Sequence, residues 1–352
     1  MKTMAQIAEE AGLSRFTVSK ILNGDSSVRE KNRTKVLELC RKHGFVPNAN
    51  AVNLVSGTSR VIGMVVPYIT DGFYAELIEL IEKRSSRRGY HMIYQSSYND
   101  AATEANIIRA FIGLNVAALL VVPVVVNPDI HIHKAAAANF PVIYLDRALP
   151  GDTSCSILND NRDSCRQMTA HLLEHSPEVA FLDSFYGESN RTAVDRKMGY
   201  LDAMREAGAQ ELILPGGETG QTQDNEYHGY NCISAFLQQH SRPPRALCCV
   251  TDAVALGAMR ALRDNGFVPG RDTLIGGHDN LHFGEFTTPT LSSMAQPKEE
   301  IAELAVNMAL KRLDDPTAEP ERKLLRSTLI VRDSSSPRGG TANTLFSGRT
   351  GK

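Results

Sequence analysis

Two kinds of hydrophobic spacing divide the chain. Over the first 45 residues, apolar positions recur every three or four residues in three short segments, which predicts three helices. From Arg60 onward, short runs rich in Val, Ile and Leu alternate with amphipathic segments. The runs that we predict as strands cover 60–69, 90–96, 117–126, 141–147, 179–184, 211–215, 246–252 and 273–279. Near-continuous apolar strands that alternate with helices favour parallel sheets covered on both faces.

The number of strand–helix units leaves two architectures open. They fit either one large barrel or two doubly wound halves. Residues 147–162 interrupt the alternation with turn residues and an extra strand, and a short strand (291–297), a helix (298–313) and a final strand (324–334) follow. These late segments indicate a chain that crosses repeatedly between two lobes. We therefore expect an α/β bilobed body with a ligand cleft at the carboxyl ends of both sheets.

The segment AQIAEEAGLSRFTVSKILNG (5–24) fits a helix–turn–helix. Gly12 supplies the turn and Ser14 is a suitable N-cap for the second helix. The positions spaced to face inward are Ile7, Ala8, Ala11, Val18, Ile21 and Leu22. Arg15 and Phe16 must then project outward, where an arginine suits guanine and a phenyl ring suits the thymine methyl group. The alternative is an ordinary helical hairpin with a solvated Arg15 and a partly buried Phe16.

Charge supports contact between this N-terminal segment and a polyanion. The whole chain has a formal net charge of −2, but residues 1–60 hold ten Lys and Arg against five Asp and Glu. A third amphipathic helix is predicted within 29–45. The segment VPNANAVNLVSGTSR (46–60) has short helical spacing and is marginal alone, so we expect it to fold as a helix only when its partner is present.

The remaining composition is that of a cytoplasmic globular protein. The six cysteines show no Cys-x-x-Cys spacing and are predicted to be reduced and mostly buried. No apolar run approaches about 20 residues, and the N-terminus lacks the apolar core of a secretory signal. His131 and His133 are interpreted as solvated rather than metal-binding, and no metal or cofactor is expected.

Specific segments identify a family. In order, MAQIAEEAGLSRFTVSKILNG, GFVPNANAVNLVSG, IGMVVPYITDGFYAELI, VIYLDR, DRKMGYLDAMREAG, TDAVALGAMRAL, IGGHDN and MAQPKEEIAELA resemble the segments of the LacI/GalR (lactose-repressor) family of bacterial transcription regulators. The resemblance covers residues 3–333. It implies a repressor that binds DNA, senses a small molecule and lies in the bacterial cytoplasm on the nucleoid.

The resemblance also implies a domain organisation. It comprises an all-α helix–turn–helix domain (1–46), a hinge helix and linker (47–59), a bilobed effector-binding and dimerisation domain (60–334) and a disordered tail (335–352). We place lobe 1 at about 60–160 and 291–322, and lobe 2 at about 161–290 and 323–334. The body is expected to have the fold of periplasmic sugar-binding proteins.

For DNA, the resemblance implies a homodimer on a near-palindromic, double-stranded operator. In the family, the hinge helix inserts a leucine into the minor groove, and Leu54 occupies that position; the alternative is that Leu54 simply packs on the N-terminal domain. The predicted DNA-binding residues are Ser14, Arg15, Phe16, Thr17, Ser19, Lys20, Asn23, Asn48, Ala51 and Leu54. No leucine heptads occur in the tail, so a tetramerising coiled coil is not expected.

For the effector, the resemblance implies a cleft that binds ligand hydroxyls. The predicted effector-binding residues are Phe73, Arg147, Asp160, Asn190, Thr192, Arg196, Asp252, Asp279 and Gln296. Planar donors, carboxylate acceptors and an aromatic ring suit a polyhydroxylated ligand, so a sugar, sugar acid or sugar phosphate is favoured over a purine. The alternatives are structural: Arg147 pairs with Asp279, Asp160 caps a helix, and Phe73 belongs to the core.

Departures from the family pattern leave the effector open. Thr251 stands where an asparagine is usual, and Gly277-His278 replaces a glycine–aromatic pair. The region 214–230 lacks an aromatic residue that several members place over the ligand, and Tyr227 is the candidate substitute.

Two other classes of function fit less well. An enzyme would need a site that the sequence lacks, because LPGGETG has neither the Lys-Ser/Thr of a P-loop nor the spacing G-x-G-x-x-G. A transport binding protein would suit the body alone, but it would not carry a DNA-reading segment and would need a signal peptide.

Overall fold

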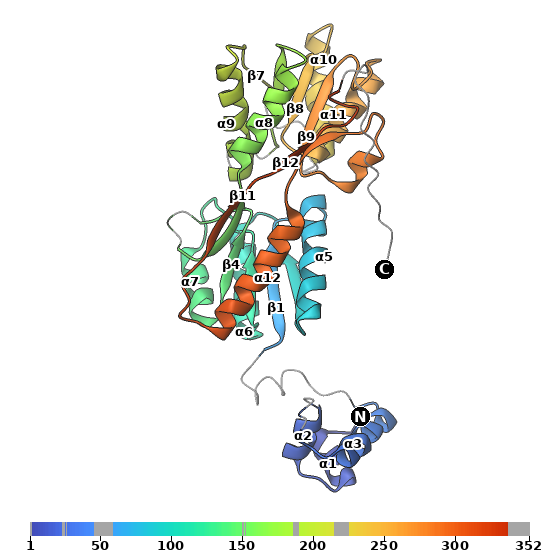
Figure 1. Ribbon diagram of the computed structural model, residues 1–352, viewed down its shortest axis with the longest axis vertical. Helices are drawn as coiled ribbons and strands as arrows, with labels where there is room; N and C mark the ends of the chain where they lie inside the picture. Colours follow the sequence, from blue (N-terminus) through green and yellow to red (C-terminus); the bar gives the residue numbers. More distant parts are fainter. Residues whose placement is uncertain are drawn as a thin grey trace. The chain divides into compact units, whose positions relative to one another are not determined.

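The computed structural model describes residues 2–22, 25, 27–45, 59–149, 151, 153–185, 190–214 and 225–336. The chain forms two compact units, Met1–Arg60 and Val61–Lys352. Both units are drawn in Figure 1.

The N-terminal unit consists of three helices. They are α1 (Met4–Ala11), α2 (Arg15–Leu22) and α3 (Glu30–His43). Thr3 and Gln6 form a capping box at the start of α1, and Gly12 ends it with a φ of +68°. The Ser14 hydroxyl accepts the amide of Thr17 at 3.1 Å, as predicted for the N-cap of α2. The buried side chains that form the core are Ile7, Ala8, Ala11, Val18, Ile21, Val36 and Cys40.

The second unit contains two α/β lobes. The first holds β1 (Val61–Val66), α5 (Gly72–Arg87), β2 (His91–Ser96), α6 (Ala101–Gly113), β3 (Ala118–Val121), α7 (Ile130–Asn139), β4 (Val142–Leu145), β5 (Cys155–Asn159), α12 (Lys298–Asp314) and β11 (Arg322–Leu325). The second holds α8 (Asn161–Leu173), β6 (Val179–Leu182), α9 (Arg191–Glu206), β7 (Leu212–Leu214), α10 (Asn225–Gln239), β8 (Ala246–Cys249), α11 (Asp252–Asp264), β9 (Leu274–His278), η2 (His282–Glu285), β10 (Ser292–Ala295) and β12 (Thr328–Ile330).

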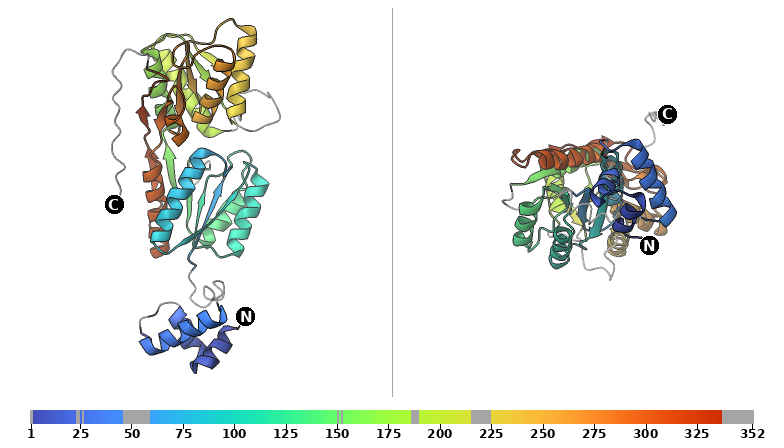
Figure 2. Two further views of the ribbon diagram at one scale, coloured as in Figure 1. Left: turned by 90° about the vertical axis from the view of Figure 1, so that its right-hand side faces the viewer. Right: turned by 90° about the horizontal axis from the view of Figure 1, so that it is seen from below.

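The strands form two six-stranded sheets, which decides for two doubly wound halves over a barrel. The strand order is β11-β5-β4-β3-β1-β2 in the first lobe and β12-β10-β9-β8-β6-β7 in the second. The ladders are parallel apart from β10 with β12, which is antiparallel. In the first lobe, α5 and α12 cover one face of the sheet and α6 and α7 cover the other (Figure 2). A separate cluster of buried side chains lies beneath each pair of helices. Burial on both faces explains the near-continuous apolar strands.

The described chain passes between the lobes at three places. These are Asp160, between β5 and α8; residues 296–297, between β10 and α12; and residues 326–327, between β11 and β12. The predicted division of the late segments is therefore wrong in two respects. Strand β10 pairs with β9 and belongs to the second lobe, and β11 pairs with β5 and belongs to the first. The predicted single strand 324–334 is two strands in different sheets.

The predicted tail also begins too early. Ser335 is fully buried, and its hydroxyl donates to that of Ser292 at 2.7 Å on β10. Residues 337–352 lie outside the described part of the chain.

Candidate functional site

The outward face of α2 carries the predicted base-reading residues. Arg15 is exposed, and Phe16 has 69% of its surface exposed, whereas Val18 and Ile21 on the same helix are buried. The Lys20 ammonium lies 5.3 Å from the centre of the Phe16 ring. A phenyl ring exposed to this extent adds little to the core. The geometry therefore matches a reading helix that presents its first turn outward.

The other predicted DNA-binding residues divide into two groups. Ser14, Thr17 and Ser19 lie on or beside α2, and the Ser14 hydroxyl is within 2.9 Å of that of Thr17. Asn23, Asn48, Ala51 and Leu54, with the predicted hinge helix, lie outside the described residues.

The second unit contains a cavity of about 650 Å³ between its two lobes. Its wall is built from the segments that follow the carboxyl ends of strands in both sheets, together with the start of α9. Its lining residues with polar side chains are Tyr68, Thr70, Asp71, Tyr74, Tyr98, Asn99, Asp146, Arg147, Ser184, Asn190, Thr192, Arg196, Asn225, Glu226, Thr251, Asp279 and Gln296, and Phe73 and Phe283 add apolar aromatic rings. This is the position at which parallel α/β sheets bind ligands.

Arg196 connects three segments on the second-lobe side of the cavity. It lies on α9 and is buried, with all three guanidinium nitrogens bound. Its Nε donates to Asn161 Oδ1 at 2.9 Å, Nη1 to the carbonyl of Val250 at 2.7 Å, and Nη2 to Asp279 Oδ1 at 3.2 Å. This fixed orientation presents a planar cation in the cavity wall.

Asp279 follows β9 and is held by several neighbours. Its Oδ1 also accepts from His278 Nδ1 at 3.1 Å and from Gln296 Nε2 at 2.7 Å. Burial alone would raise the pKa of Asp279, but Arg196 and these hydrogen bonds outweigh it and hold the pKa below its ordinary value. Its φ of +106° is rare for a residue with a side chain, and Lys298 Nζ donates to its carbonyl at 3.0 Å.

Arg147 has the corresponding position on the first-lobe side. It follows β4, and its Nη1 donates to Asn99 Oδ1 at 3.0 Å and its Nη2 to the Tyr74 hydroxyl at 3.2 Å. That hydroxyl in turn donates to Asp146 Oδ2 at 2.9 Å. Burial raises the pKa of Tyr74 well above its ordinary value, so the phenol is neutral and remains a donor. The predicted alternative, a pair between Arg147 and Asp279, is not formed, because Asp279 is bound to Arg196.

Asp71 is an acidic residue of the cavity wall on which the charge of Arg147 acts, although no salt bridge joins the two among the described residues. Its side chain caps α5 by accepting the amide of Phe73 at 2.9 Å. Burial and the negative charge of Asp279 raise its pKa to about 6.

Three buried polar atoms in the cavity wall have no hydrogen-bond partner among the described residues. They are Arg147 Nε, the Ser184 hydroxyl and Gln296 Oε1. Each side chain is at least nine-tenths buried, and the carboxylate closest to Arg147 Nε, that of Asp146, is 3.5 Å away. Because an unsatisfied buried polar group is costly, these atoms are available for hydrogen bonds to water or to a ligand.

The structure brings seven of the nine predicted effector-binding residues to this cavity. They are Phe73, Arg147, Asn190, Thr192, Arg196, Asp279 and Gln296. Phe73 also belongs to the first-lobe core, so both of its predicted roles are compatible. Neither Asp160 nor Asp252 is among the lining residues. Asp160 caps α8 by accepting the amide of Asp163 at 3.0 Å, which is its predicted alternative.

Asp252 instead turns inward at the start of α11. It is fully buried, and its carboxylate accepts from the amide of Leu281 at 2.7 Å and the hydroxyl of Ser293 at 2.6 Å. Burial, followed by the negative charge of Asp279, raises its pKa to about 8. It therefore supports the segment behind Asp279 rather than the cavity wall.

Other residues differ from the sequence interpretation. His133 is not solvated: it is buried, with Nε2 2.9 Å from Glu104 Oε1 and Nδ1 3.2 Å from the Tyr144 hydroxyl, whereas His131 is exposed. Tyr227 is exposed and is not among the lining residues. Asp71, Tyr74, Asp146 and Ser184 were missed, although Asp146 could have been found because it precedes Arg147 at the end of a predicted strand.

Further sequence expectations concern cysteines and membranes. All six cysteines are free, and all but Cys232 are buried. None of the described helices has the length and apolarity needed to cross a membrane.

Comparison with protein families matches two parts of the chain. Residues 3–48 match bacterial regulatory proteins of the lacI family, and residues 177–335 match the periplasmic binding protein-like domain. The first match covers the three helices, and the second covers most of the second lobe with α12.

Individual proteins match almost the whole chain. The HTH-type transcriptional regulator GalR of Escherichia coli K12 is 28% identical over 96% of both chains. The ribose operon repressor of the same strain is 27% identical over 95% of this chain and all of its own. The HTH-type transcriptional repressor PurR of Mannheimia succiniciproducens is 26% identical over 95% of this chain and 98% of its own.

Solved structures share the fold. The lac repressor dimer bound to operator and the anti-inducer ONPF has a TM-score of 0.81 at 22% identity, covering 95% of this chain and 99% of its own. A LacI family regulator from Enterococcus faecium with bound ribose has a TM-score of 0.67 at 23% identity, covering 79% and 99%.

Proposed function

Because this chain belongs to the LacI family of bacterial regulatory proteins, we propose that an uncharged, polyhydroxylated effector in the cavity between its lobes controls its affinity for operator DNA. The family consists of DNA-binding transcriptional regulators, not enzymes, and the named relatives include repressors. The class of effector, the residues that bind it and the dimeric state are proposed here.

The observation that carries the class of effector is the set of unpartnered buried atoms. Arg147 Nε requires an acceptor, Gln296 Oε1 requires a donor, and the Ser184 hydroxyl can take either role. A hydroxyl group both donates and accepts, so a ligand with several hydroxyls satisfies all three atoms. The Phe73 ring offers an apolar face for the C–H side of such a ligand.

The charge of the cavity wall favours a neutral sugar over a sugar acid or a sugar phosphate. The wall contains four carboxylates, those of Asp71, Asp146, Glu226 and Asp279, and the two guanidinium groups of Arg147 and Arg196. Arg196 is already bound to Asp279, and Arg147 lies beside Asp146. An added phosphate would face uncompensated carboxylates, which disfavours its binding by like-charge repulsion.

For DNA, we propose a homodimer that reads a near-palindromic operator through Arg15 and Phe16 on α2. Support comes from the exposure of both side chains and from the basic composition of residues 1–60. The lac repressor, whose fold this chain shares, binds its operator as a dimer in the solved structure. An effector that prefers one angle between the lobes shifts the equilibrium between a state that binds the operator and a state that does not. The size of the shift is set by the difference between the effector's affinities for these two states.

The test measures melting temperature and DNA affinity together. Neutral pentoses, hexoses and disaccharides are compared with their phosphates and acids at equal concentration, and an operator is first obtained by selection from random duplexes. We expect a neutral sugar to raise the melting temperature and to change operator affinity. Gln296→Ala should weaken this response, whereas Gln239→Ala, at an exposed position on α10, should not. Stabilisation by phosphates or acids alone would refute the proposed class.

A further inference from the structure

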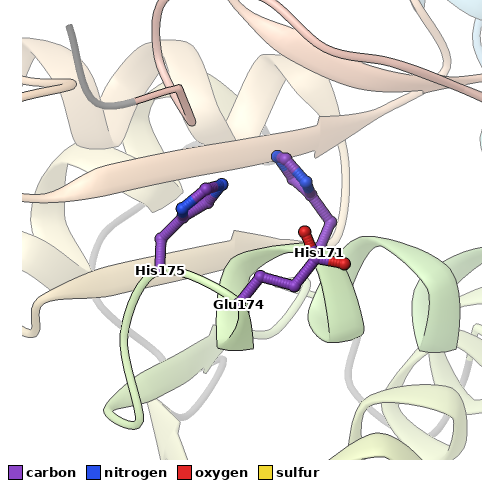
Figure 3. Close-up of side chains that lie close together, drawn as sticks. All are labelled: His171, Glu174 and His175. Atoms are coloured by element: carbon purple, nitrogen blue, oxygen red, sulfur yellow. The ribbon is translucent and has the colours of Figure 1, made fainter. Parts of the chain in front are cut away.

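Three side chains with metal-binding atoms gather at the end of α8, away from the cavity. They are His171, Glu174 and His175, and one ligand atom from each lies within 4.8 Å of the others. Figure 3 shows both imidazole rings and the carboxylate on the same side of the helix end. His171 lies on the last turn of α8, and Glu174 and His175 belong to the turn that follows it, which brings their side chains beside His171. We propose that this cluster is a binding site for a zinc-class divalent ion.

The hydrogen bonds of His171 determine which of its ring nitrogens is available. Its Nε2 lies 2.8 Å from the Ser335 hydroxyl. That hydroxyl donates its own hydrogen to Ser292 Oγ at 2.7 Å, and Ser292 donates to the carbonyl of Arg332 at 3.0 Å. Ser335 must therefore accept from His171 Nε2–H, which leaves the lone pair of Nδ1 to bind a metal. Histidine ligands of metals usually donate their other N–H in this way.

The surroundings of the cluster favour a cation and allow it to enter. Helix α8 ends at Leu173, and its final carbonyls give this end a partial negative charge. Glu174 and His175 are exposed, so an ion can reach the cluster from solvent. Ser335 is fully buried and fixes the His171 ring from behind. One side of the site is thus rigid, and the other can close over the ion.

The ligand set indicates the class of ion. Two imidazole nitrogens and one carboxylate oxygen suit Zn²⁺, which binds such groups at roughly 2.0–2.2 Å. Those bond lengths require the ligand atoms to come closer than 4.8 Å. Small rotations of the exposed Glu174 and His175 side chains provide this movement. Water completes the coordination, because three protein ligands leave the fourth position open.

The experiment titrates Zn²⁺ into the full-length, metal-free protein by calorimetry, in a buffer that does not chelate zinc. We expect one ion per chain with an affinity that His175→Ala lowers by about tenfold or more. His131→Ala, which removes an exposed histidine from another helix, is the matched control and should leave the affinity unchanged. Melting temperatures measured without zinc establish that both variants are folded.

A second variant tests the positioning role of Ser335. Ser335→Ala removes the acceptor that orients His171 and should lower zinc affinity by about tenfold, and Ser335→Thr should restore it. The proposal is overturned if the wild-type protein binds no zinc at about 1 mM, or if His175→Ala binds it as tightly as the wild type. Neither measurement depends on the sugar or the DNA, so its outcome is separate from the proposed function.

Discussion

Nη2 of Arg196 and Oδ1 of Asp279 lie 3.2 Å apart and connect α9 to the turn after β9. Both side chains are buried, and both line the cavity between the lobes. The pair therefore has two roles. It neutralises a buried carboxylate, and it holds in one orientation the two groups that we propose bind the effector.

Arg196→Ala should lower stability and remove the effector response. The substitution leaves Asp279 buried without its cation, which typically costs about 3–5 kcal/mol of unfolding free energy. Urea unfolding measures the loss, and operator binding with and without the effector measures the response. We expect operator binding itself to persist in the folded variant.

Arg191→Ala provides the control on the same helix. Arg191 is exposed and paired with Asp195 one turn away, so its removal should change stability by about 1 kcal/mol or less. If Arg196→Ala were no more destabilising than this control and still responded to effector, Arg196 would have neither role.

Asp252 predicts a fall in stability that begins above about pH 4 and ends near pH 8. Its pKa is about 8 in the folded chain and has the ordinary value of 3.8 when unfolded, so between these values only the folded chain retains the proton. Raising the pH from about 4 toward 8 therefore removes stability, with a slope of at most about 1.4 kcal/mol per pH unit that vanishes above the folded pKa. The raised pKa of Asp71, about 6, adds to this slope only below about that pH, so measurements from about pH 6.5 to 8 isolate Asp252.

Asp252→Asn should abolish that slope. The amide retains an acceptor for the amide of Leu281 and carries no charge. Chemical unfolding at several pH values compares the variant with the wild type. Parallel stability curves for the two proteins across the interval would contradict the raised pKa.

Phe16→Ala should change operator preference without unfolding the N-terminal unit. Because the ring is largely exposed, its loss should alter stability by no more than about 0.5 kcal/mol. Val18→Ala, at a fully buried position on α2, should cost about 1–3 kcal/mol. Selection from random duplexes measures preference: a changed base at one position supports base reading, and a uniform loss of affinity would assign Phe16 to the phosphate backbone.

Gly199→Ala should separate α8 from α9. A Cβ atom at this position would lie 2.0 Å from the carbonyl oxygen of Arg162, and neither backbone can yield locally. We expect a loss of about 1–3 kcal/mol in thermal or chemical unfolding. Gly113→Ala, at the end of α6 with open space around it, should be neutral or stabilise by up to about 1 kcal/mol. Equal effects of the two substitutions would contradict close packing at Gly199.

Strands and helices were predictable because their signals are local. Strand β1 follows directly from an apolar run. The turn at Gly12 follows from the need for a residue that readily adopts a left-handed backbone conformation. The division of 324–334 into β11 and β12 was not predictable, because both pieces have strand-like spacing. Only the pairing of Leu325 with Asn159 and of Thr328 with Ala295 shows that the chain changes sheets between them.

Residues of the cavity wall were predictable from their position directly after a strand. Which of these side chains turn away from the cavity was not predictable in this way. Arg196 and Asp279 lie in the wall as the resemblance implied. Asp252 follows β8 in the same manner, but its carboxylate binds the amide of Leu281, a contact between residues far apart in the sequence. His133 was misjudged for a similar reason, since its partners Glu104 and Tyr144 come from other elements.

The three crossings between the lobes lie side by side, which limits how the body can move. The amide of Asp160 donates to the carbonyl of Leu325 at 2.7 Å, and Ala295 pairs with Thr328. A change in the angle between the lobes must therefore rotate the backbone of all three segments together. Because Gln296 lies on one of these segments and also in the cavity wall, we expect the proposed effector selectivity and the ease of bending to depend on the same residue. Evolution of a new specificity at this position would alter the mechanical response at the same time.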